Sequence, residues 1–305
     1  MNRRYYFSES SDMSSKSKAR YHILAILAVV IWGTTFVATK MLISAGLHPT
    51  EIFIYRFVIA YICILFMARG RLWSDSWRDE VLLFFAGITG GSLYFITENT
   101  ALQYTQAINV AMIISGTPLL TTLLAMAIFK SERTRSPRRI IAGSVIALAG
   151  VLVVIFNGGE ALEFNLLGDI LTLAAALSWA VYSILLKVLG GRYSALFITR
   201  KVFAYGLLSM LLWLPIHPTP FSIELLARPE VLGNILFLGA LASMLCFAIW
   251  SAVVKNLGTV KSTNYINLNP IVTFISAYLL LGEVITPLSF VGAIAIIGGV
   301  YIIER

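Results

Sequence analysis

The strongest constraint in this sequence is a series of apolar runs, each about 20 residues long, separated by short polar segments. A helix rises about 1.5 Å per residue, so a run of that length spans the hydrocarbon core of a bilayer. Charged residues make up only 12% of the chain, and its mean hydropathy is +0.85. A water-facing surface cannot be built from this composition, so the sequence predicts an all-α integral membrane protein.

Ten runs meet the length criterion, although the fifth is short. Lys and Arg concentrate in alternate connecting segments, beginning with the N-terminal tail. Because translocation of these residues is disfavoured during insertion, the alternation predicts that both termini lie in the cytoplasm. The predicted spans are Tyr21–Ile43, Pro49–Met67, Val81–Tyr104, Ala107–Phe129, Arg139–Phe156, Leu166–Leu189, Ala195–Pro215, Val231–Val254, Val260–Leu281 and Pro287–Ile303.

Several classes of function find no support in the sequence. The net charge of +8 is divided among clusters between apolar runs, which is typical of membrane topology, so we expect no nucleic-acid partner. Cys63 and Cys246 lie inside apolar runs, so we expect neither a disulfide framework nor a metal site. The sequence shows no phosphate-binding glycine loop and no nucleophile beside a base, so we expect no cofactor and no enzyme.

The chain contains an internal repeat. Trp32 and Lys40 in the first span have the same separation as Trp179 and Lys187 in the sixth. The match continues through the later spans, so one unit of five spans has been duplicated. The further matches pair 54–61 with 198–205, Gly87 with Gly239, Pro118 with Pro270, Gly143 with Gly292, and Gly150 with Gly299.

The odd number of spans in each unit determines how the two units are oriented. The second unit is inserted upside down relative to the first, which gives an inverted repeat. The predicted architecture is ten transmembrane helices, arranged as two inverted five-helix repeats around a central cavity. After a cytoplasmic tail of residues 1–20, the repeats cover 21–157 and 166–304.

An inverted repeat has a functional consequence, because it can open to either side of the membrane by nearly equivalent motions. The leading hypothesis is therefore a secondary transporter with alternating access about a midplane site. An uncoupled uniporter or channel of the same fold is one alternative. A membrane-embedded lipid-modifying enzyme is another, and the absence of a polar catalytic cluster counts against it.

Short motifs occur in order along both halves. The first half has Trp32-Gly33-x-x-Phe36, Arg56, Asn99-x-Ala101-Leu-x-Tyr104-Thr-x-Ala107, Pro118 and the region of Glu132. The second half has Trp179, Arg200, Pro270 and Leu281-Gly282-Glu283. Together, over about residues 21–304, the motifs resemble the drug/metabolite transporter superfamily and specifically its ten-helix EamA-type transporters.

The resemblance implies export or import of small metabolites, often amino acids or related compounds, across a bacterial inner membrane. It does not fix the substrate. The four-helix small multidrug transporters of the same superfamily use a glutamate in their first span. The first span here has no acidic residue, so their antiport mechanism is not carried over.

Trp32 and Trp179 are the first site candidates. Trp32 lies roughly 16 Å into a core about 30 Å thick, and Trp179 lies at a similar depth from the other side. A midplane indole N–H needs a partner or a wet cavity. We therefore predict that both rings line the substrate cavity, with packing against neighbouring helices as the alternative. Polar neighbours that favour the cavity are Thr34, Thr35, Ser178, Tyr182 and Ser183.

Glu98 is the acidic residue placed well inside a predicted span. Carboxylates within a membrane are costly and usually functional. We predict that Glu98 binds a cationic amine or carries a coupling proton, with Asn99 able to share either role. A structural hydrogen bond is the alternative.

Arg56 and Arg200, like Lys40 and Lys187, lie near span ends and are expected to snorkel to the headgroups. If they face the cavity instead, a metabolite with both a carboxylate and an amine would fit Arg together with Glu98.

The remaining candidates lie in the later spans of each repeat. Pro118 and Pro270 are predicted to act in gating, because each proline frees a backbone carbonyl one turn earlier. The expected partners are a small-molecule substrate and the lipid bilayer, and the chain is treated as a monomer. The other predicted substrate-binding residues are Tyr94, Ser115, Trp250, Tyr265 and Asn267.

Overall fold

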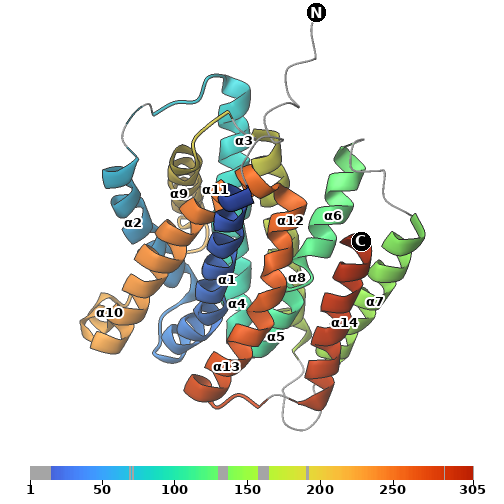
Figure 1. Ribbon diagram of the computed structural model, residues 1–305. Helices are drawn as coiled ribbons and strands as arrows, with labels where there is room; N and C mark the ends of the chain where they lie inside the picture. The colour runs from blue at the N-terminus through green and yellow to red at the C-terminus, as the bar shows by residue number, and fades with distance from the viewer. Residues whose placement is uncertain are drawn as a thin grey trace, which may run out of the picture.

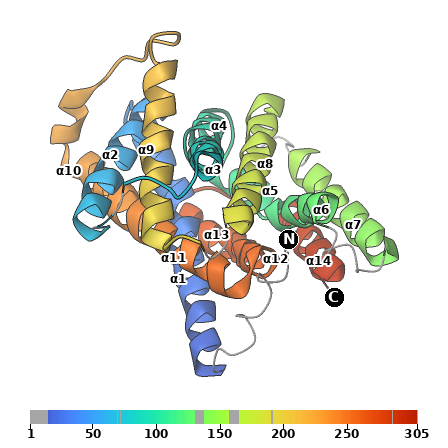
Figure 2. The same ribbon diagram turned by 90° about the horizontal axis from the view of Figure 1, so that it is seen from above.

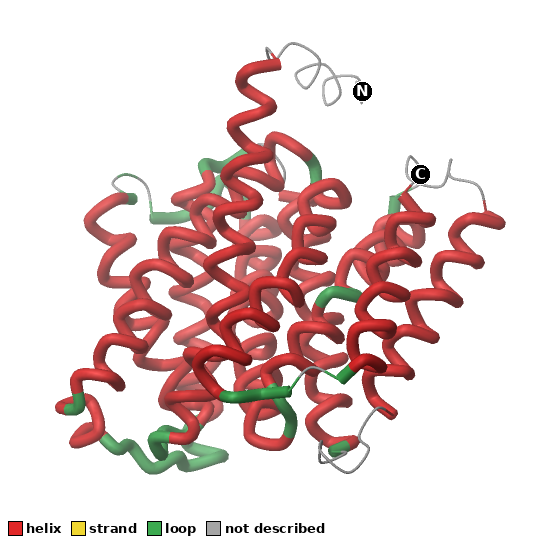
Figure 3. Tube along the Cα trace, turned by 60° about the horizontal axis from the view of Figure 1, so that its bottom comes forward, coloured by secondary structure: helices red, strands yellow, loops and turns green. Residues whose placement is uncertain are grey.

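The computed structural model describes residues 15–68, 70, 72–129, 137–156, 165–189, 192–284 and 286–304. Within these ranges the chain is built of helices joined by turns and loops, and it contains no strand (Figure 3). The first 14 residues of the predicted tail, and Glu132, lie outside the described residues.

Seven helices in the described residues are long and apolar enough to cross a membrane. Two shorter apolar helices, Ile141–Val154 and Pro287–Ile302, fall where the fifth and tenth spans are predicted. The seven are Ala19–Ser44, Pro49–Met67, Trp77–Tyr104, Ala107–Ile128, Leu166–Leu189, Ala195–Trp213 and Pro229–Leu257.

The helical elements follow the duplicated order of the sequence (Figure 1). The first half contains α1 (Ser15–Ser44), α2 (Pro49–Met67), α3 (Trp77–Gly87), η1 (Ile88–Ser92), α4 (Leu93–Tyr104), α5 (Ala107–Ile114), α6 (Thr117–Ile128) and α7 (Pro137–Phe156). The second half contains α8 (Leu166–Leu189), α9 (Ala195–Trp213), η3 (Ile223–Ala227), α10 (Pro229–Leu236), η4 (Phe237–Leu245), α11 (Cys246–Leu257), α12 (Thr259–Thr263), η5 (Asn264–Leu268), α13 (Asn269–Leu281) and α14 (Pro287–Glu304).

The same helices are interrupted in both halves. The third span contains the π-helical segment η1, and its counterpart contains the π-helical segment η4. The fourth span breaks between α5 and α6, and its counterpart tightens into the 3₁₀ segment η5 before α13. Pro118 and Pro270 each lie in the first turn of the helix after the break, where a missing N–H costs no hydrogen bond.

The first helix of each half packs against an interrupted helix of the other half, as is expected of two inverted units. Helix α1 of the first half packs against η4 and α11 of the second half. Correspondingly, α8 of the second half packs against η1 and α4 of the first. Helices α7 and α14 form a pair at the edge of the molecule, away from α2 and α10 (Figures 1 and 2). The two interrupted helices of each half therefore surround the centre, while α7 and α14 stay outside it.

Candidate functional site

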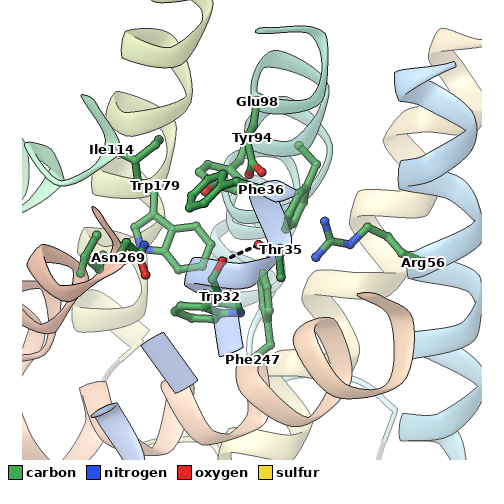
Figure 4. Close-up of a pocket in the computed structure, with 12 residues that line it drawn as sticks. Trp32, Thr35, Phe36, Arg56, Tyr94, Glu98, Ile114, Trp179, Phe247 and Asn269 are labelled. Carbon is green, nitrogen blue, oxygen red and sulfur yellow. Dashed lines mark hydrogen bonds between the residues drawn. The ribbon is translucent and has the colours of Figure 1, made fainter. Parts of the chain in front are cut away.

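A small cavity lies at the centre of the molecule, where the two halves meet (Figure 4). Its volume is about 30 Å³, which is room for about two water molecules. Residues of both halves line it, and most are aromatic or aliphatic. The lining residues are Trp32, Thr35, Phe36, Arg56, Tyr94, Phe95, Glu98, Ile114, Trp179, Phe247, Ile266 and Asn269.

The two tryptophans predicted at the midplane face each other across this centre. The ring centroids of Trp32 and Trp179 lie 5.2 Å apart with an interplanar angle of 85°, an edge-to-face arrangement that aromatic pairs favour. Trp32 Nε1 donates a hydrogen bond to the carbonyl of Ala242 in η4, at 2.9 Å. Trp179 Nε1 is buried and has no hydrogen-bond partner among the described residues. The two tryptophans therefore occupy equivalent positions in the repeats, but only one of their indole N–H groups forms a hydrogen bond among the described residues.

Arg56 and Glu98 provide the charged part of the lining. Arg56 comes from α2, and its Nε donates to Ser243 Oγ at 2.9 Å. The Arg56 guanidinium carbon lies 4.1 Å from the centroid of the Phe95 ring, within the range of a cation–π contact. Glu98 follows Phe95 by three residues in α4, so both project from one face of that helix. Both charged side chains are only 1% exposed.

Five of the predicted substrate-binding residues line the cavity: Trp32, Thr35, Tyr94, Glu98 and Trp179. Two others form the layer behind the tryptophans. The Trp250 ring lies 5.1 Å from that of Trp32, and the Tyr182 ring lies 5.1 Å from that of Trp179. Trp250 and Tyr182 are fully buried and pack against the lining without being part of it.

The remaining predicted residues lie outside the cavity. The Asn99 amide donates to a backbone carbonyl at the start of α2, at 3.1 Å. The Ser115 hydroxyl donates to a backbone carbonyl of its own helix, at 2.6 Å. Tyr265 forms a hydrogen bond with His22 near the beginning of α1. Asn267 lies in η5 but is not part of the lining.

Sequence reasoning missed the apolar part of the lining. The alignment that pairs the two prolines also pairs Phe95 with Phe247 and Ile114 with Ile266. All four of these side chains line the cavity. An apolar residue inside an apolar helix does not by itself indicate a site. The repeat would have identified these four residues if equivalent positions had been compared for apolar as well as polar residues.

The expectation that Arg56 snorkels to the headgroups is wrong, because its side chain is buried at the cavity. Its repeat counterpart Arg200 lies elsewhere and lines a separate cavity of about 250 Å³ together with Arg192. The repeat alignment suggests why the two arginines differ. Arg56 bonds to Ser243, whereas the position equivalent to Ser243 in the first half is Gly91, which has no side chain to accept such a bond.

One end of the central region is closed by polar contacts to the turn between α4 and α5. Lys40 Nζ donates to two backbone carbonyls at the end of α4, at 2.6 and 2.8 Å. The first two backbone N–H groups of α5 donate to the Glu283 carboxylate, at 2.9 and 3.0 Å. A carboxylate at a helix N-terminus is favourable because it meets the positive end of the helix dipole. These contacts join α1, α4, α5 and the end of α13.

Buried acids at the start of α3 close the opposite end. Arg192 donates two hydrogen bonds to Asp79, at 2.6 and 2.8 Å, and the Tyr193 hydroxyl donates to the same carboxylate at 2.6 Å. Burial, and the hydrogen bond to Asp79, raise the pKa of the Tyr193 hydroxyl above its ordinary value. Glu80 pairs with Lys201 of α9. Acidic residues therefore fasten α3 to α9 and to the segment before it.

No group of three or more His, Cys, Asp or Glu residues within the described ranges could hold a metal ion. The arrangement offers two opposite charges, an unpartnered indole N–H and an aromatic wall around one small cavity.

Comparison with known proteins agrees with this architecture. The chain is similar to a "probable terminal-alkyne amino-acid exporter" of Streptantibioticus cattleyicolor, with 30% identity over 92% of each chain. It is 29% identical to a "probable amino-acid metabolite efflux pump" of Salmonella typhimurium, covering 92% of this chain and 93% of that one. An uncharacterized transporter of Archaeoglobus fulgidus is 27% identical over 95% of this chain and 98% of its own.

A solved crystal structure shares the fold, with a TM-score of 0.65 at 20% identity, covering 93% of this chain and 97% of that chain. The EamA-like transporter family matches residues 19–156 and again residues 166–305, once for each half of the duplicated chain. Both halves, with their apolar helices, make this chain a multi-pass membrane transporter that belongs to the EamA-like transporter family.

Proposed function

We propose that this protein exports amino acids or closely related small metabolites by alternating access about the central cavity. The proposal includes ten transmembrane helices, both termini in the cytoplasm, and a location in the inner (plasma) membrane of a cell. The observation that carries it is the central cavity itself, which takes equivalent residues from both repeats and is fastened at both ends by polar contacts.

The interrupted helices suggest how such a cavity opens. Ile114 at the end of α5 and Ile266 in η5 line the cavity immediately before the breaks, and Pro118 and Pro270 begin the helices that follow. A hinge at each break would move the lining without unfolding the rest of the helix. The names of two of the three relatives support export as the direction, since one is named a probable terminal-alkyne amino-acid exporter and the other a probable amino-acid metabolite efflux pump.

Counterflow in proteoliposomes tests the proposal. Vesicles loaded with an unlabelled mixture of amino acids are placed in a trace of the same labelled amino acids, with and without an imposed pH gradient. A carrier accumulates label transiently above the empty-vesicle level, whereas a channel does not. We expect accumulation in the wild type and its loss in Trp32→Ala. Trp77→Ala is the matched control, because Trp77 is 81% exposed at the start of α3.

The gradient separates the two driving forces. Counterflow that responds to the pH gradient indicates proton coupling, whereas counterflow that ignores it indicates an uncoupled carrier. If loaded vesicles never exceed empty ones for any amino acid or related metabolite, the proposed function is refuted.

A further inference from the structure

Two opposite charges are buried in the same cavity without forming an ion pair. Arg56 reaches the cavity from α2, and Glu98 reaches it from α4 (Figure 4). They are close enough to interact electrostatically. Within the described residues, however, the ion pairs are those of Arg192 with Asp79 and of Lys201 with Glu80, and Arg56 with Glu98 is not among them.

The surroundings explain why the two charges stay apart. Ser243 holds Arg56 at Nε, and the Phe95 ring lies against the guanidinium. Tyr94 lies one turn before Glu98 on α4, and both side chains line the cavity. Arg56 is thus held by neighbours other than Glu98.

Each group also keeps one atom unsatisfied. Arg56 Nη1 and Glu98 Oε1 are both buried and have no hydrogen-bond partner among the described residues. Leaving a buried polar atom unpaired is costly, and for a charged group it is more so. A ligand that offers a carboxylate to Arg56 and an ammonium to Glu98 would satisfy both atoms at once.

The rest of the lining limits which other chemical groups such a ligand can have. Apart from Arg56 and Glu98, the lining residues bear no formal charge. Trp32 and Trp179 provide broad apolar faces, and the polar groups that remain are uncharged: Thr35, Asn269, the Tyr94 hydroxyl and the Trp179 indole N–H. A ligand with a third charge would bury it without a partner, whereas an apolar side chain would meet the aromatic rings.

We propose that the cavity, once widened beyond its present volume of about 30 Å³, recognises a neutral amino acid as its zwitterion, with the carboxylate bound by Arg56, the ammonium bound by Glu98, and an apolar side chain against Trp32 and Trp179. This inference rests on the proposed function and specifies the substrate class of the same site. It excludes simple amines, simple carboxylates, and amino acids with charged side chains as good ligands.

The pair formed by Arg56 and Glu98, called the clamp below, occurs only once among the described residues at the centre, so a zwitterion can bind there in only one orientation. The position equivalent to Glu98 in the second half is Trp250, which contributes a ring and no charge. The position equivalent to Arg56 is Arg200, whose Nη1 donates to a backbone carbonyl at the end of α2 and which lines a different cavity. The second half therefore offers no second clamp at the centre, and we expect one ligand per chain.

The test compares ligands that differ by one charged group. Isothermal titration calorimetry of the purified full chain in detergent uses L-leucine, 3-methylbutylamine and 4-methylpentanoate, which share one side chain. L-Phenylalanine, 2-phenylethylamine and 3-phenylpropanoate form a second series, and L-lysine and L-glutamate test the third charge. We expect at least one of the two neutral amino acids to bind with one site per chain. Its analogues, lysine and glutamate should bind about 100-fold more weakly or worse, because each leaves a buried charge unpaired.

Charge-matched variants separate recognition from folding. Glu98→Gln should weaken amino-acid binding about 100-fold while leaving the affinity for the carboxylate analogue within a few-fold of wild type. Arg56→Gln should likewise weaken amino-acid binding about 100-fold while leaving the affinity for the amine analogue within a few-fold of wild type. Such reciprocal changes would not follow from a merely structural role. Arg200→Gln is the matched control outside the central cavity, and its affinity should be unchanged; thermal unfolding confirms that every variant is folded.

Three results would overturn the clamp. The first is equal affinity for an amino acid and its decarboxylated amine. The second is Glu98→Gln protein that keeps amino-acid affinity and loses only the pH dependence of transport, which would make Glu98 a proton carrier. The third is counterflow of some other metabolite with no binding of neutral amino acids. That third result would leave the proposed transporter standing, whereas the absence of any counterflow would refute both.

Discussion

The contact between α7 and α14 makes a prediction that can be worked out atom by atom. A Cβ added to Gly299 of α14 would lie 2.5 Å from both the backbone N of Ala147 and the backbone O of Gly143 in α7, and 2.8 Å from the Ala147 Cβ. Ordinary contacts are about 3.5 Å or longer. Because two of these three atoms belong to the backbone, no rotamer change relieves the overlap, and the two helices must move apart.

The expected cost follows from this geometry. Overpacking a tight contact by one methyl group typically costs about 1–3 kcal/mol. The neighbouring Gly298 is the matched control, because a Cβ there would meet no atom within 4 Å. Alanine is favoured over glycine in a helix by about 1 kcal/mol, so Gly298→Ala should be neutral or slightly stabilising. Both variants gain the same helix propensity, so they should differ in free energy of unfolding by the overpacking cost alone, about 1–3 kcal/mol.

The assay is unfolding of the purified protein in dodecyl maltoside micelles by increasing SDS, followed by circular dichroism. Gly299→Ala should unfold at a clearly lower SDS fraction than the wild type, and Gly298→Ala should not. Neither residue lines the central cavity, so ligand affinity in the folded fraction should be unchanged for both. Equal unfolding midpoints for the two variants would refute the argument that close helix approach at Gly299 holds α14 against α7.

Two further predictions concern the polar network at the start of α3. Lys201→Met removes the cation from the Glu80 carboxylate, which keeps its hydrogen bonds from Ser74 and Tyr205, and should destabilise the protein by about 1–3 kcal/mol in the same unfolding assay. The double variant Lys201→Met/Glu80→Met should recover much of that loss, and a double variant as unstable as the single one would contradict this account. Tyr193 has a raised pKa, so its bond to Asp79 stabilises the fold below the ordinary tyrosine pKa of about 10 and is lost as pH rises through the raised value. Stability measured from pH 8 to pH 12 should therefore fall less steeply in Tyr193→Phe than in the wild type, and identical slopes would count against it.

Some of the predicted site residues lie at the central cavity and others do not, for identifiable reasons. Trp32 and Trp179 were placed at the centre because a tryptophan at mid-depth in an apolar run is unusual, and the repeat doubled that signal. Asn99 and Ser115 were equally plausible as polar residues inside a span. Both instead bond to nearby backbone carbonyls, and a sequence does not reveal which of its carbonyls are left free for a side chain.

The sequence by itself determined the class of molecule. Apolar runs of bilayer length and a duplicated unit indicated a helical membrane protein built of two repeats, because both properties are local or periodic and can be read directly along the sequence. The family resemblance rested on the same duplicated motifs and is confirmed by the match over both halves.

Only the tertiary structure showed which of the charged side chains lie at the central cavity. Arg56 and Arg200 occupy equivalent positions in the two repeats, yet one lies at the central cavity and the other lines a cavity elsewhere. Arg56 donates to Ser243, which is remote in sequence and adjacent in space. A buried charge is stable only where other helices provide its partners, and a linear sequence does not show which helices those are.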